Sequence, residues 1–600
     1  MNIELKEFVK DEEFINKMNK AFADLRADYE LSLDITKDKI SELKKVHVDH
    51  KNFLANLVSF SVKSSGVLSG LRGTGKTHLF LLARDEINQK INKEKALCVY
   101  LNVKRLHLPE NFDQELFNRV FSVFLYEEIS KQLLLLLKDI CNDDYFSKFL
   151  LLFNSDKKRL YKNVSDALVK LLSFKIIAQQ GNQTYEGLEK GTVSKEAFEK
   201  EIIKIQSELS GKIGESNIEL SSKLSSELLD EVSRKICNNN TYLKFLNIYS
   251  VREQLIELLG ILNLQSVTFF VDEWEKLYYN QKSQEYLSFY IDRIIDNPLY
   301  FWLGVVPYRG QLYHLDNGAD LQHYFNLDEA LIYENSKNDK DLCMAYFKEF
   351  INKRLFYYFN DDKYNFHLLF DNDRKLELLV LASMGNSRDF GTMLLDCWSE
   401  YQSYRSSSLA PGRPYKYIHN SMIIRAIKNN GDKKFTNIRN EPNLMAVWKD
   451  VENFCLSRSY SHFAIEESKE NMEVVSSKEI SELIYHRLLH FRKGHVPPKD
   501  TKINYKLSIY ALNYAGIYDL HAKDRKINYV TDYDTIHDRV RRYIYDPKPI
   551  IQNLRLQSGE VVPCGSCGEE INIVKMKGAW EKNFCPFCTG RIRKDESNFS

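Results

Sequence analysis

Four residues between positions 70 and 77 have the types and the spacing that bind a triphosphate. The segment reads GLRGTGKT, and Gly70, Gly75, Lys76 and Thr77 match the pattern G-x-x-x-x-G-K-[ST]. Glycine lets the backbone curl closely enough for several N–H groups to point at phosphate oxygens, at the start of a helix whose dipole favours anions. The segment therefore predicts a phosphate-binding loop.

The residues around this loop suit that chemistry. An apolar run at positions 65–69 precedes it and indicates a short strand, and an apolar stretch after it indicates a helix. We expect Lys76 to contact the β- and γ-phosphates of ATP, and the Thr77 hydroxyl to complete the Mg²⁺ shell. A glycine-rich turn that matches by accident is the alternative, and the flanking strand and helix argue against it.

An acidic pair follows a second apolar run. Residues 267–271 read VTFFV and are followed by Asp272 and Glu273. An acid at the carboxyl end of a central strand faces the crevice where open α/β sheets bind ligands. We expect Asp272 to hold Mg²⁺ through water and Glu273 to deprotonate the attacking water. The alternative is that the pair merely caps the next helix. The predicted nucleotide-binding residues are Gly70, Gly73, Thr74, Gly75, Lys76, Thr77 and Asp272.

Composition limits the class of protein. The 600 residues exceed what one hydrophobic core usually serves. The chain has 84 basic and 83 acidic residues, so bulk charge gives no reason to expect nucleic-acid or membrane binding. The acidic N-terminus excludes a secretory signal, and no apolar run is long enough to cross a bilayer. We therefore expect a cytoplasmic protein with no membrane partner.

Nearly two hundred residues separate Thr77 from Asp272, more than two or three βα units need. The surplus, at about 143–240, is polar and has apolar residues at three- and four-residue steps between Glu and Lys. This pattern predicts a helical insertion. It could bind an effector protein, or it could be a solvated surface helix with no special role.

Four cysteines near the C-terminus have the spacing of a metal site. Cys564 and Cys567 form one C-x₂-C step, and Cys585 and Cys588 form another after seventeen residues. Four thiolates at this spacing can surround Zn²⁺ tetrahedrally, and a small module without its own core needs that metal to fold. We predict a structural zinc ribbon, which could contact either nucleic acid or protein.

The region after residue 408 has no motif as specific as the phosphate-binding loop or the cysteine steps. A turn-rich break at 409–413 is followed by helical segments and a predicted hairpin. The pattern is compatible with a winged helix, and helical packing with no DNA contact is the alternative. The best candidate for a local basic patch lies here. These basic residues either form a solvated surface with no ligand or contact phosphate groups. The members of the patch are Arg413, Lys416, Arg425, Lys428, Lys433, Lys434 and Arg439, with Asp432 as the only acid between them.

The motifs along the chain are, in order, the phosphate-binding loop, the acidic strand end, the apolar run at 299–306 and a later helical segment that contains MGNSRDF. This order resembles that of the AAA+ ATPases, most closely the origin-recognition-complex type. The resemblance covers roughly residues 45–405 without the insertion. It implies a P-loop ATPase in which a lid arginine, called sensor 2, contacts the nucleotide. The matching G-x-x-R runs from Gly385 to Arg388, so Arg388 takes that role by resemblance.

The chain departs from that family in two places. The sensor 1 position usually carries a polar amide, and the candidates here are Tyr308 and Arg309. An arginine finger is expected before the final strand, but Gln322 and His323 stand there. These departures put hydrolysis by a ring completed by neighbouring subunits in doubt.

The predicted fold class is α/β, with a P-loop NTPase parallel sheet, a helical insertion, a helical lid, a mainly α C-terminal region and a zinc ribbon. The predicted boundaries are 1–50 for an N-terminal helical segment, 51–330 for the ATPase core, 331–408 for the lid, 409–550 for the C-terminal domain and 551–600 for the ribbon.

The predicted function is Mg²⁺-dependent ATP hydrolysis that controls engagement of a nucleic-acid or protein partner, with Lys76, Glu273 and Arg388 as catalytic residues. Nucleic acid would bind the C-terminal region, and we expect a homo-oligomer. ATPases of this architecture occur in bacterial antiphage defence, which is an analogy only. The alternative is a nucleotide-gated switch or scaffold that hardly hydrolyses ATP and recruits a separate effector.

Overall fold

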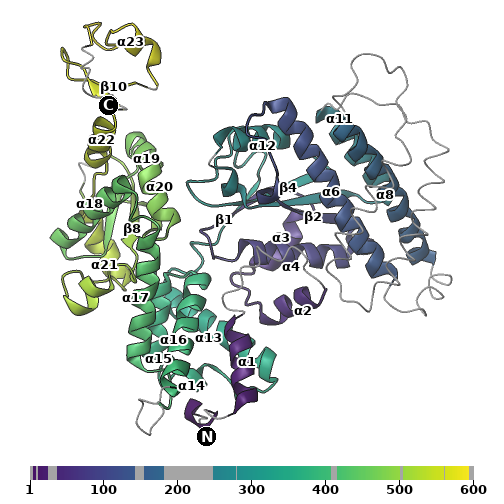
Figure 1. Ribbon diagram of the computed structural model, residues 1–600, viewed down its shortest axis with the longest axis horizontal. Helices are drawn as coiled ribbons and strands as arrows, with labels where there is room; N and C mark the ends of the chain where they lie inside the picture. The colour runs from purple at the N-terminus through teal and green to yellow at the C-terminus, as the bar shows by residue number, and fades with distance from the viewer. Residues whose placement is uncertain are drawn as a thin grey trace. The chain divides into compact units, whose positions relative to one another are not determined.

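The computed structural model describes residues 4–8, 11–23, 37–141, 155–180, 248–278, 280–406, 415–500, 504–559, 561–573 and 575–592 (Figure 1). The chain divides into two compact units. One unit comprises Asp28–Leu327, and the other comprises Met1–Ala27 together with Asp328–Ser600. We call them the sheet unit and the helical unit.

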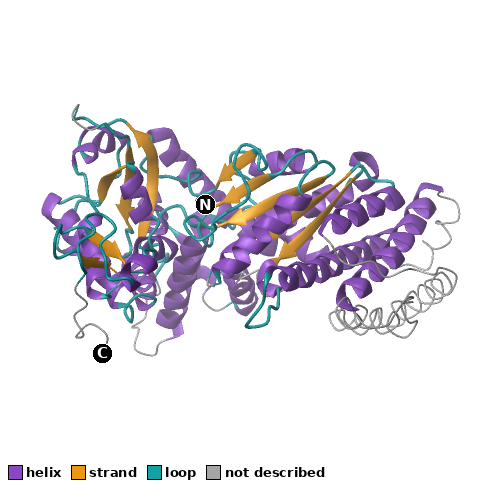
Figure 2. Ribbon diagram, turned by 90° about the horizontal axis from the view of Figure 1, so that it is seen from above, coloured by secondary structure: helices purple, strands orange, loops and turns teal. Residues whose placement is uncertain are grey.

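The sheet unit is built on five parallel strands, drawn in orange in Figure 2. Their order across the sheet is β2-β3-β4-β1-β5. This confirms the predicted α/β class with a parallel sheet. The strands are β1 (Gly66–Ser69), β2 (Ala96–Asn102), β3 (Ser266–Asp272), β4 (Leu299–Val305) and β5 (His323–Asn326).

Helices cover both faces of this sheet, which is why its three central strands and β2 read as near-continuous apolar runs. Alternate strand residues enter two separate cores. One core takes in α2 (Lys37–Val46), α3 (Phe53–Ser61) and α4 (Lys76–Gln89). The other takes in α6 (Gln114–Cys141), α8 (Ser155–Gln180), α11 (Ile248–Leu262) and α12 (Gln281–Ile294). A short helix, α5 (Ile91–Glu94), precedes β2.

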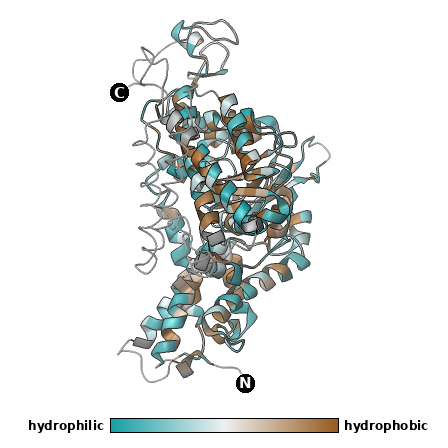
Figure 3. Ribbon diagram, turned by 90° about the vertical axis from the view of Figure 1, so that its right-hand side faces the viewer, coloured by the Kyte–Doolittle hydropathy of each residue, from teal (hydrophilic) through white to brown (hydrophobic). Residues whose placement is uncertain are grey.

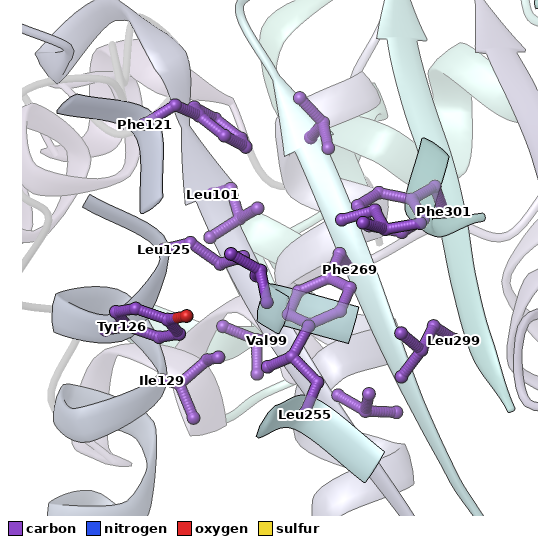
Figure 4. Packing of buried hydrophobic residues seen from close by; sticks show 14 of the residues in the cluster. Val99, Leu101, Phe121, Leu125, Tyr126, Ile129, Leu255, Phe269, Leu299 and Phe301 are labelled. Carbon is purple, nitrogen blue, oxygen red and sulfur yellow. The ribbon is translucent and has the colours of Figure 1, made fainter. Parts of the chain in front are cut away.

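Figure 4 shows how the second core packs. Val99, Leu101 and Phe269 project from β2 and β3 toward Leu125 of α6 and Leu255 of α11. These side chains are fully or almost fully buried. Since close-packed interiors stabilise through many small contacts, this face fixes the positions of the strands and therefore of their carboxyl ends.

The strand order creates a reversal in the connections. From β1 the chain crosses β4 and β3 to reach β2, and from β4 it crosses β1 in the opposite direction to reach β5. Open parallel sheets bind ligands at such a reversal, outside the carboxyl ends of the strands. The reversal here lies between β1 and β4.

The predicted insertion at about 143–240 is described only in part. Helix α8 falls within it and packs against α6 and α11, burying Val164, Leu168 and Leu171. The remainder, including the amphipathic segment at 194–236, lies outside the described residues.

The helical unit begins with α1 (Glu12–Ala23), which packs on α13 and α16. The Phe22 ring stacks on Trp398 with centroids 5.3 Å apart, and Trp398 Nε1 donates to Asn19 Oδ1 at 2.9 Å. Teal and brown stretches alternate along the helices in Figure 3, as amphipathic helices around a core require. The larger helices are α13 (Lys337–Phe359), α15 (Asp373–Ser383), α16 (Ser387–Ser406), α17 (Asn420–Thr436) and α18 (Pro442–Arg458), with the short α14 (Phe366–Leu369).

A second sheet follows α18 in the chain. Three antiparallel strands pair in the order β6-β8-β7, with α19 and α20 between β6 and β7 in sequence. These elements are β6 (His462–Glu466), α19 (Lys469–Val475), α20 (Lys478–Tyr485), β7 (Leu489–Val496) and β8 (Leu507–Leu512). The chain ends with α21 (Tyr533–Asp538), α22 (Lys548–Gln557), β9 (Val561–Pro563), β10 (Glu570–Asn572) and α23 (Lys577–Glu581).

Two buried carboxylates tie this second sheet and α17 to the rest of the helical unit. Glu334 accepts from Arg492 Nη2 at 2.8 Å, and His462 Nε2 lies 3.1 Å from Glu334 Oε1. Asp389 pairs in the same way with Arg487 and Lys434, as described below. Burial opposes ionisation of both carboxyls, but the neighbouring cations hold the pKa of Glu334 and of Asp389 well below the usual range.

We expect this unit to lose stability in acid. A carboxyl whose pKa is lowered by folding contributes stability that is fully present above its unfolded pKa of about 4 and is lost as the pH falls below it. The loss should be roughly 1 to 2 kcal/mol per carboxyl between about pH 5 and about pH 3. Calorimetric unfolding of Glu334→Gln should show a weaker pH dependence than the wild type. The exposed Glu473→Gln is the control, and an unchanged slope in Glu334→Gln would contradict the assignment.

Candidate functional site

The turn between β1 and α4 lies at the reversal point of the sheet. Gly73 and Gly75 have φ values of 90° and 101°, a left-handed conformation that favours glycine. A Cβ on Gly70 would lie 2.6 Å from Thr74 Oγ1, so the turn needs glycine there as well. Gly70 N donates to Val305 O at 3.0 Å, which ties the start of the turn to β4.

Lys76 is the first residue of α4 and is 8% exposed. Its ammonium group donates to Gly70 O at 2.6 Å and to Leu71 O at 3.3 Å. The side chain therefore folds back along the turn instead of extending away from it. This holds a positive charge beside the backbone N–H groups at the start of the helix, where an anion would bind.

The structure brings Thr77 and Asp272 together although they lie 195 residues apart in the chain. Thr77 Oγ1 donates to Asp272 Oδ2 at 2.5 Å, and the Asp272 side chain is almost fully buried. Asp272 Oδ1 accepts from Glu273 N at 2.9 Å. A hydroxyl and a carboxylate are hard oxygen donors of the kind that Mg²⁺ prefers, so the donor set fits that ion.

The sequence did not predict a third partner of this carboxylate. Tyr100 of β2 donates its hydroxyl to Asp272 Oδ2 at 2.8 Å. In the register of β2 and β3, Tyr100 lies opposite Phe270, two residues before Asp272. The only signal in the sequence is a hydroxyl-bearing residue near the carboxyl end of an apolar run.

Gly304 explains how Asp272, at the end of β3, reaches Thr77 in α4, although β4 lies between β3 and the strand β1 that precedes α4. A Cβ on Gly304 would lie 2.9 Å from Asp272 Oδ1 and 2.9 Å from Phe80 Cε2. Both distances are too short for a real Cβ, so the missing side chain makes the space that the carboxylate uses. No motif or spacing in the sequence distinguishes this glycine from the others.

We expect Gly304→Ala to displace Asp272. The substitution should destabilise the sheet unit by about 1–3 kcal/mol through overpacking. It should also weaken the Mg²⁺-dependent ATP binding that the sequence predicts by about tenfold. Thermal unfolding and ATP titrations with magnesium or EDTA would measure both effects. Gly260→Ala on α11 is the control, because an added Cβ there meets nothing within 4 Å. Wild-type behaviour of Gly304→Ala in both assays would contradict this role.

Glu273 directly follows the strand that carries Asp272. It is buried and has φ 65°, and its Oε2 lies 3.9 Å from Lys276 Nζ. Although it stands at the N-cap of the short 3₁₀ turn Trp274–Leu277, its side chain makes no capping hydrogen bond. The capping alternative therefore lacks its defining contact. The role of Glu273 as a base stays a prediction.

The two sensor 1 candidates follow β4. Tyr308 has a left-handed backbone with φ 65°. Arg309 is buried, and its guanidinium lies 5.3 Å from the centre of the Tyr278 ring, while its carbonyl accepts from Gln284 Nε2 at 2.8 Å. Arg309 thus helps to pack the segment that follows Glu273.

Arg388 belongs to the helical unit, so its sensor 2 role also stays a prediction. The glycine of its G-x-x-R motif has a local explanation. Gly385 has φ 83°, and a Cβ there would lie 2.1 Å from Leu331 O. Next to Arg388, Asp389 accepts two hydrogen bonds of 3.0 Å from Arg487 and pairs with Lys434 at 2.9 Å.

The predicted basic patch is largely neutralised by ion pairs. Lys434 is buried against Asp389, and Arg439 lies 3.7 Å from Asp432. The other described members pair at the surface with acids from other elements, and Arg413 lies outside the described residues. Such pairing lowers the local positive charge that phosphate contact would need. The surface pairs are Lys416–Glu4, Arg425–Glu400, Lys428–Asp519 and Lys433–Asp396.

The four predicted zinc ligands form one cluster. The sulfur atoms of Cys564 and Cys588 are 3.7 Å apart, those of Cys567 and Cys585 are 3.8 Å apart, and all four lie within 4.8 Å of one another. Four sulfurs about 2.3 Å from a central zinc would be about 3.8 Å apart, whereas a disulfide needs about 2.05 Å. The cluster therefore fits Zn²⁺.

The ribbon backbone also favours thiolates. Ser566 N lies 3.4 Å from Cys564 Sγ, and Gly590 N lies 3.4 Å from Cys588 Sγ. Hydrogen bonds from the backbone N–H groups of Cys567 and Ser566 lower the pKa of the Cys564 thiol to about 6. Zinc binds the deprotonated form of cysteine, so these contacts favour the metal-binding form of Cys564. Backbone N–H groups act in the same direction at Cys567 and Cys588, but desolvation and the neighbouring thiols raise the pKa of both. The cationic residues Arg593 and Lys594 lie outside the described residues.

Comparison with known proteins added no family assignment. A scan against protein-family models and a search of curated proteins found no match for this chain. Among the described helices, none combines the length and the apolar character needed to span a bilayer.

Proposed function

We propose that this chain is a Mg²⁺-dependent ATPase that binds its nucleotide at the turn between β1 and α4. The observation that carries the proposal is the hydrogen bond between Thr77 Oγ1 and Asp272 Oδ2, at the point where the sheet connections reverse. Two residues from distant parts of the chain supply the oxygens for a magnesium ion, beside an ammonium group and a glycine-rich helix start.

Each residue has a distinct task in this proposal. The N–H groups of the turn and the Lys76 ammonium bind the phosphates and balance their charge. Thr77 would hold a magnesium ion directly, and Asp272 would hold it through water. Glu273 accepts a proton from the attacking water. The bound magnesium neutralises charge that develops on the β- and γ-phosphate oxygens.

We further propose an AAA+-like, origin-recognition-like arrangement. The strand that ends in Asp272 is separated from β1 by one strand, and the helices α13, α15 and α16 follow the sheet as a lid would. The junction between the units leaves the sheet beside the site, since Leu327 N donates to Ser69 O at 2.9 Å.

The elements from α18 to β8 support a winged-helix-like module, because three antiparallel strands alternate with helices in the order α18-β6-α19-α20-β7-β8. However, α20 is buried from Ile480 to Tyr485, and the nearby basic patch is ion-paired. These observations favour a protein partner over base readout by α20.

Phosphate release from ATP tests the proposal. The purified chain should release phosphate only with a divalent cation, and Lys76→Met should abolish release without unfolding the protein. Phosphate release that is equal in the wild type and in Lys76→Met would overturn it.

A nucleotide-gated switch is the second candidate. It is favoured by Gln322 and His323, which stand where an arginine finger is expected. A wild type that binds Mg²⁺-ATP tightly but does not turn it over, even after addition of co-purifying proteins, would select the switch.

A further inference from the structure

We propose that Tyr100 is a positioning residue for the magnesium ion of this site, which it serves by fixing the Asp272 carboxylate through a hydrogen bond from its phenol. This inference rests on the proposed function, because it concerns the same metal. It adds a residue from a third strand, β2, to a site otherwise made by the turn after β1 and the end of β3.

The hydrogen bonds that the Asp272 carboxylate accepts support this role for Tyr100. Asp272 Oδ2 accepts from Tyr100 at 2.8 Å and from Thr77 at 2.5 Å, while Oδ1 accepts from Glu273 N. Thr77 is the partner that a magnesium ion would take as a ligand. The phenol and the backbone N–H group would then be the contacts that keep the carboxylate in place. Second-shell hydrogen bonds of this kind orient the first shell and affect metal affinity.

The surroundings keep Tyr100 a hydrogen-bond donor. The residue is 7% exposed, and burial together with the charge of Asp272 raises its pKa well above the usual range. An ionised carboxylate only accepts hydrogen bonds, so the phenol is the donor of this pair. The same face of β2 carries Ala96 and Cys98, which have no hydroxyl group. A phenylalanine would fill the space as well, so packing alone does not explain the phenol.

Tyr100→Phe removes only the oxygen and isolates its contribution. The readout is the ratio of ATP affinities measured with magnesium and with EDTA, since a purely structural role would not change this ratio. We expect the ratio to fall about tenfold in Tyr100→Phe, with ATP affinity in EDTA within about twofold of the wild type. In an Asp272→Asn background the same substitution should have no further effect on the ratio.

Tyr290→Phe is the matched control. Tyr290 is also buried in the sheet unit, and its hydroxyl lies 2.7 Å from Ser122 Oγ, away from the carboxylate. Its removal should leave the ratio unchanged. If Tyr100→Phe does not fold, 3-fluorotyrosine at position 100 keeps the ring and the hydroxyl and alters only the donor strength, and the ratio should still shift by about twofold or more.

The outcomes separate the two proposals. A wild type that binds no Mg²⁺-ATP overturns both the proposed function and this inference. The inference alone is overturned if the wild type and Tyr290→Phe bind Mg²⁺-ATP normally and the ratio is unchanged in Tyr100→Phe or in the fluorotyrosine protein.

Discussion

Glu273→Gln should lower ATP turnover by at least about a hundredfold and leave ATP affinity close to that of the wild type. The substitution keeps the size of the side chain but removes the carboxylate that would accept a proton from the attacking water. Asp272, Thr77 and Lys76 remain, so binding should persist. Single-turnover phosphate release and equilibrium ATP binding, measured on the same preparation, would test both halves of this expectation.

Glu275→Gln provides the control for that experiment. Glu275 lies two residues further on, is equally buried, and has no expected role in the reaction. It reports the effect of removing a buried carboxylate from the same segment. Turnover that is equal in Glu273→Gln and in the wild type would remove Glu273 from the role of base, and so would equal losses in the two variants.

Cys585→Ser should release zinc from the C-terminal ribbon and unfold it. From β9 onward, the described part of the ribbon buries only three apolar side chains besides its cysteines, so metal binding must supply most of its stability. They are Val561, Ile571 and Ile592. Structural zinc contributes about 10–16 kcal/mol in comparable small modules at neutral pH. Metal analysis should find one zinc per wild-type chain and almost none per variant chain, and Trp580 fluorescence should report the unfolding.

The matched variant is Cys455→Ser, which alters a buried cysteine in α18 outside the cluster. It should retain one zinc per chain. Full zinc content in Cys585→Ser would contradict the assignment. A wild type that purifies without metal and with disulfides among the four ribbon cysteines would contradict it as well.

Local patterns were enough to predict the parallel sheet and the cysteine cluster. The runs that became β2, β3 and β4 are apolar throughout, because helices cover both faces of the sheet. The ribbon could be predicted because four ligands at two fixed steps define a tetrahedral site without reference to the rest of the chain. In both cases the determining residues are close together in sequence.

The remaining features depend on contacts between distant residues. The role of Gly304 follows from strand order, since β4 separates β3 from β1 only in the folded sheet. Tyr100 approaches Asp272 through the register of two strands 172 residues apart at these positions. The partners of the basic residues are equally distant, as with Lys428 and Asp519. Sequence spacing carries no information on such pairs.

Equilibrium binding of ATP in the presence of magnesium tests the central claim most directly. The account predicts one ATP bound per wild-type chain, with affinity at least about tenfold weaker in both Lys76→Met and Asp272→Asn. One substitution lies at the start of α4 and the other at the end of β3, and they remove opposite charges, so a shared loss would locate the nucleotide between them. Undiminished binding in both variants, or no binding by the wild type, would contradict the account.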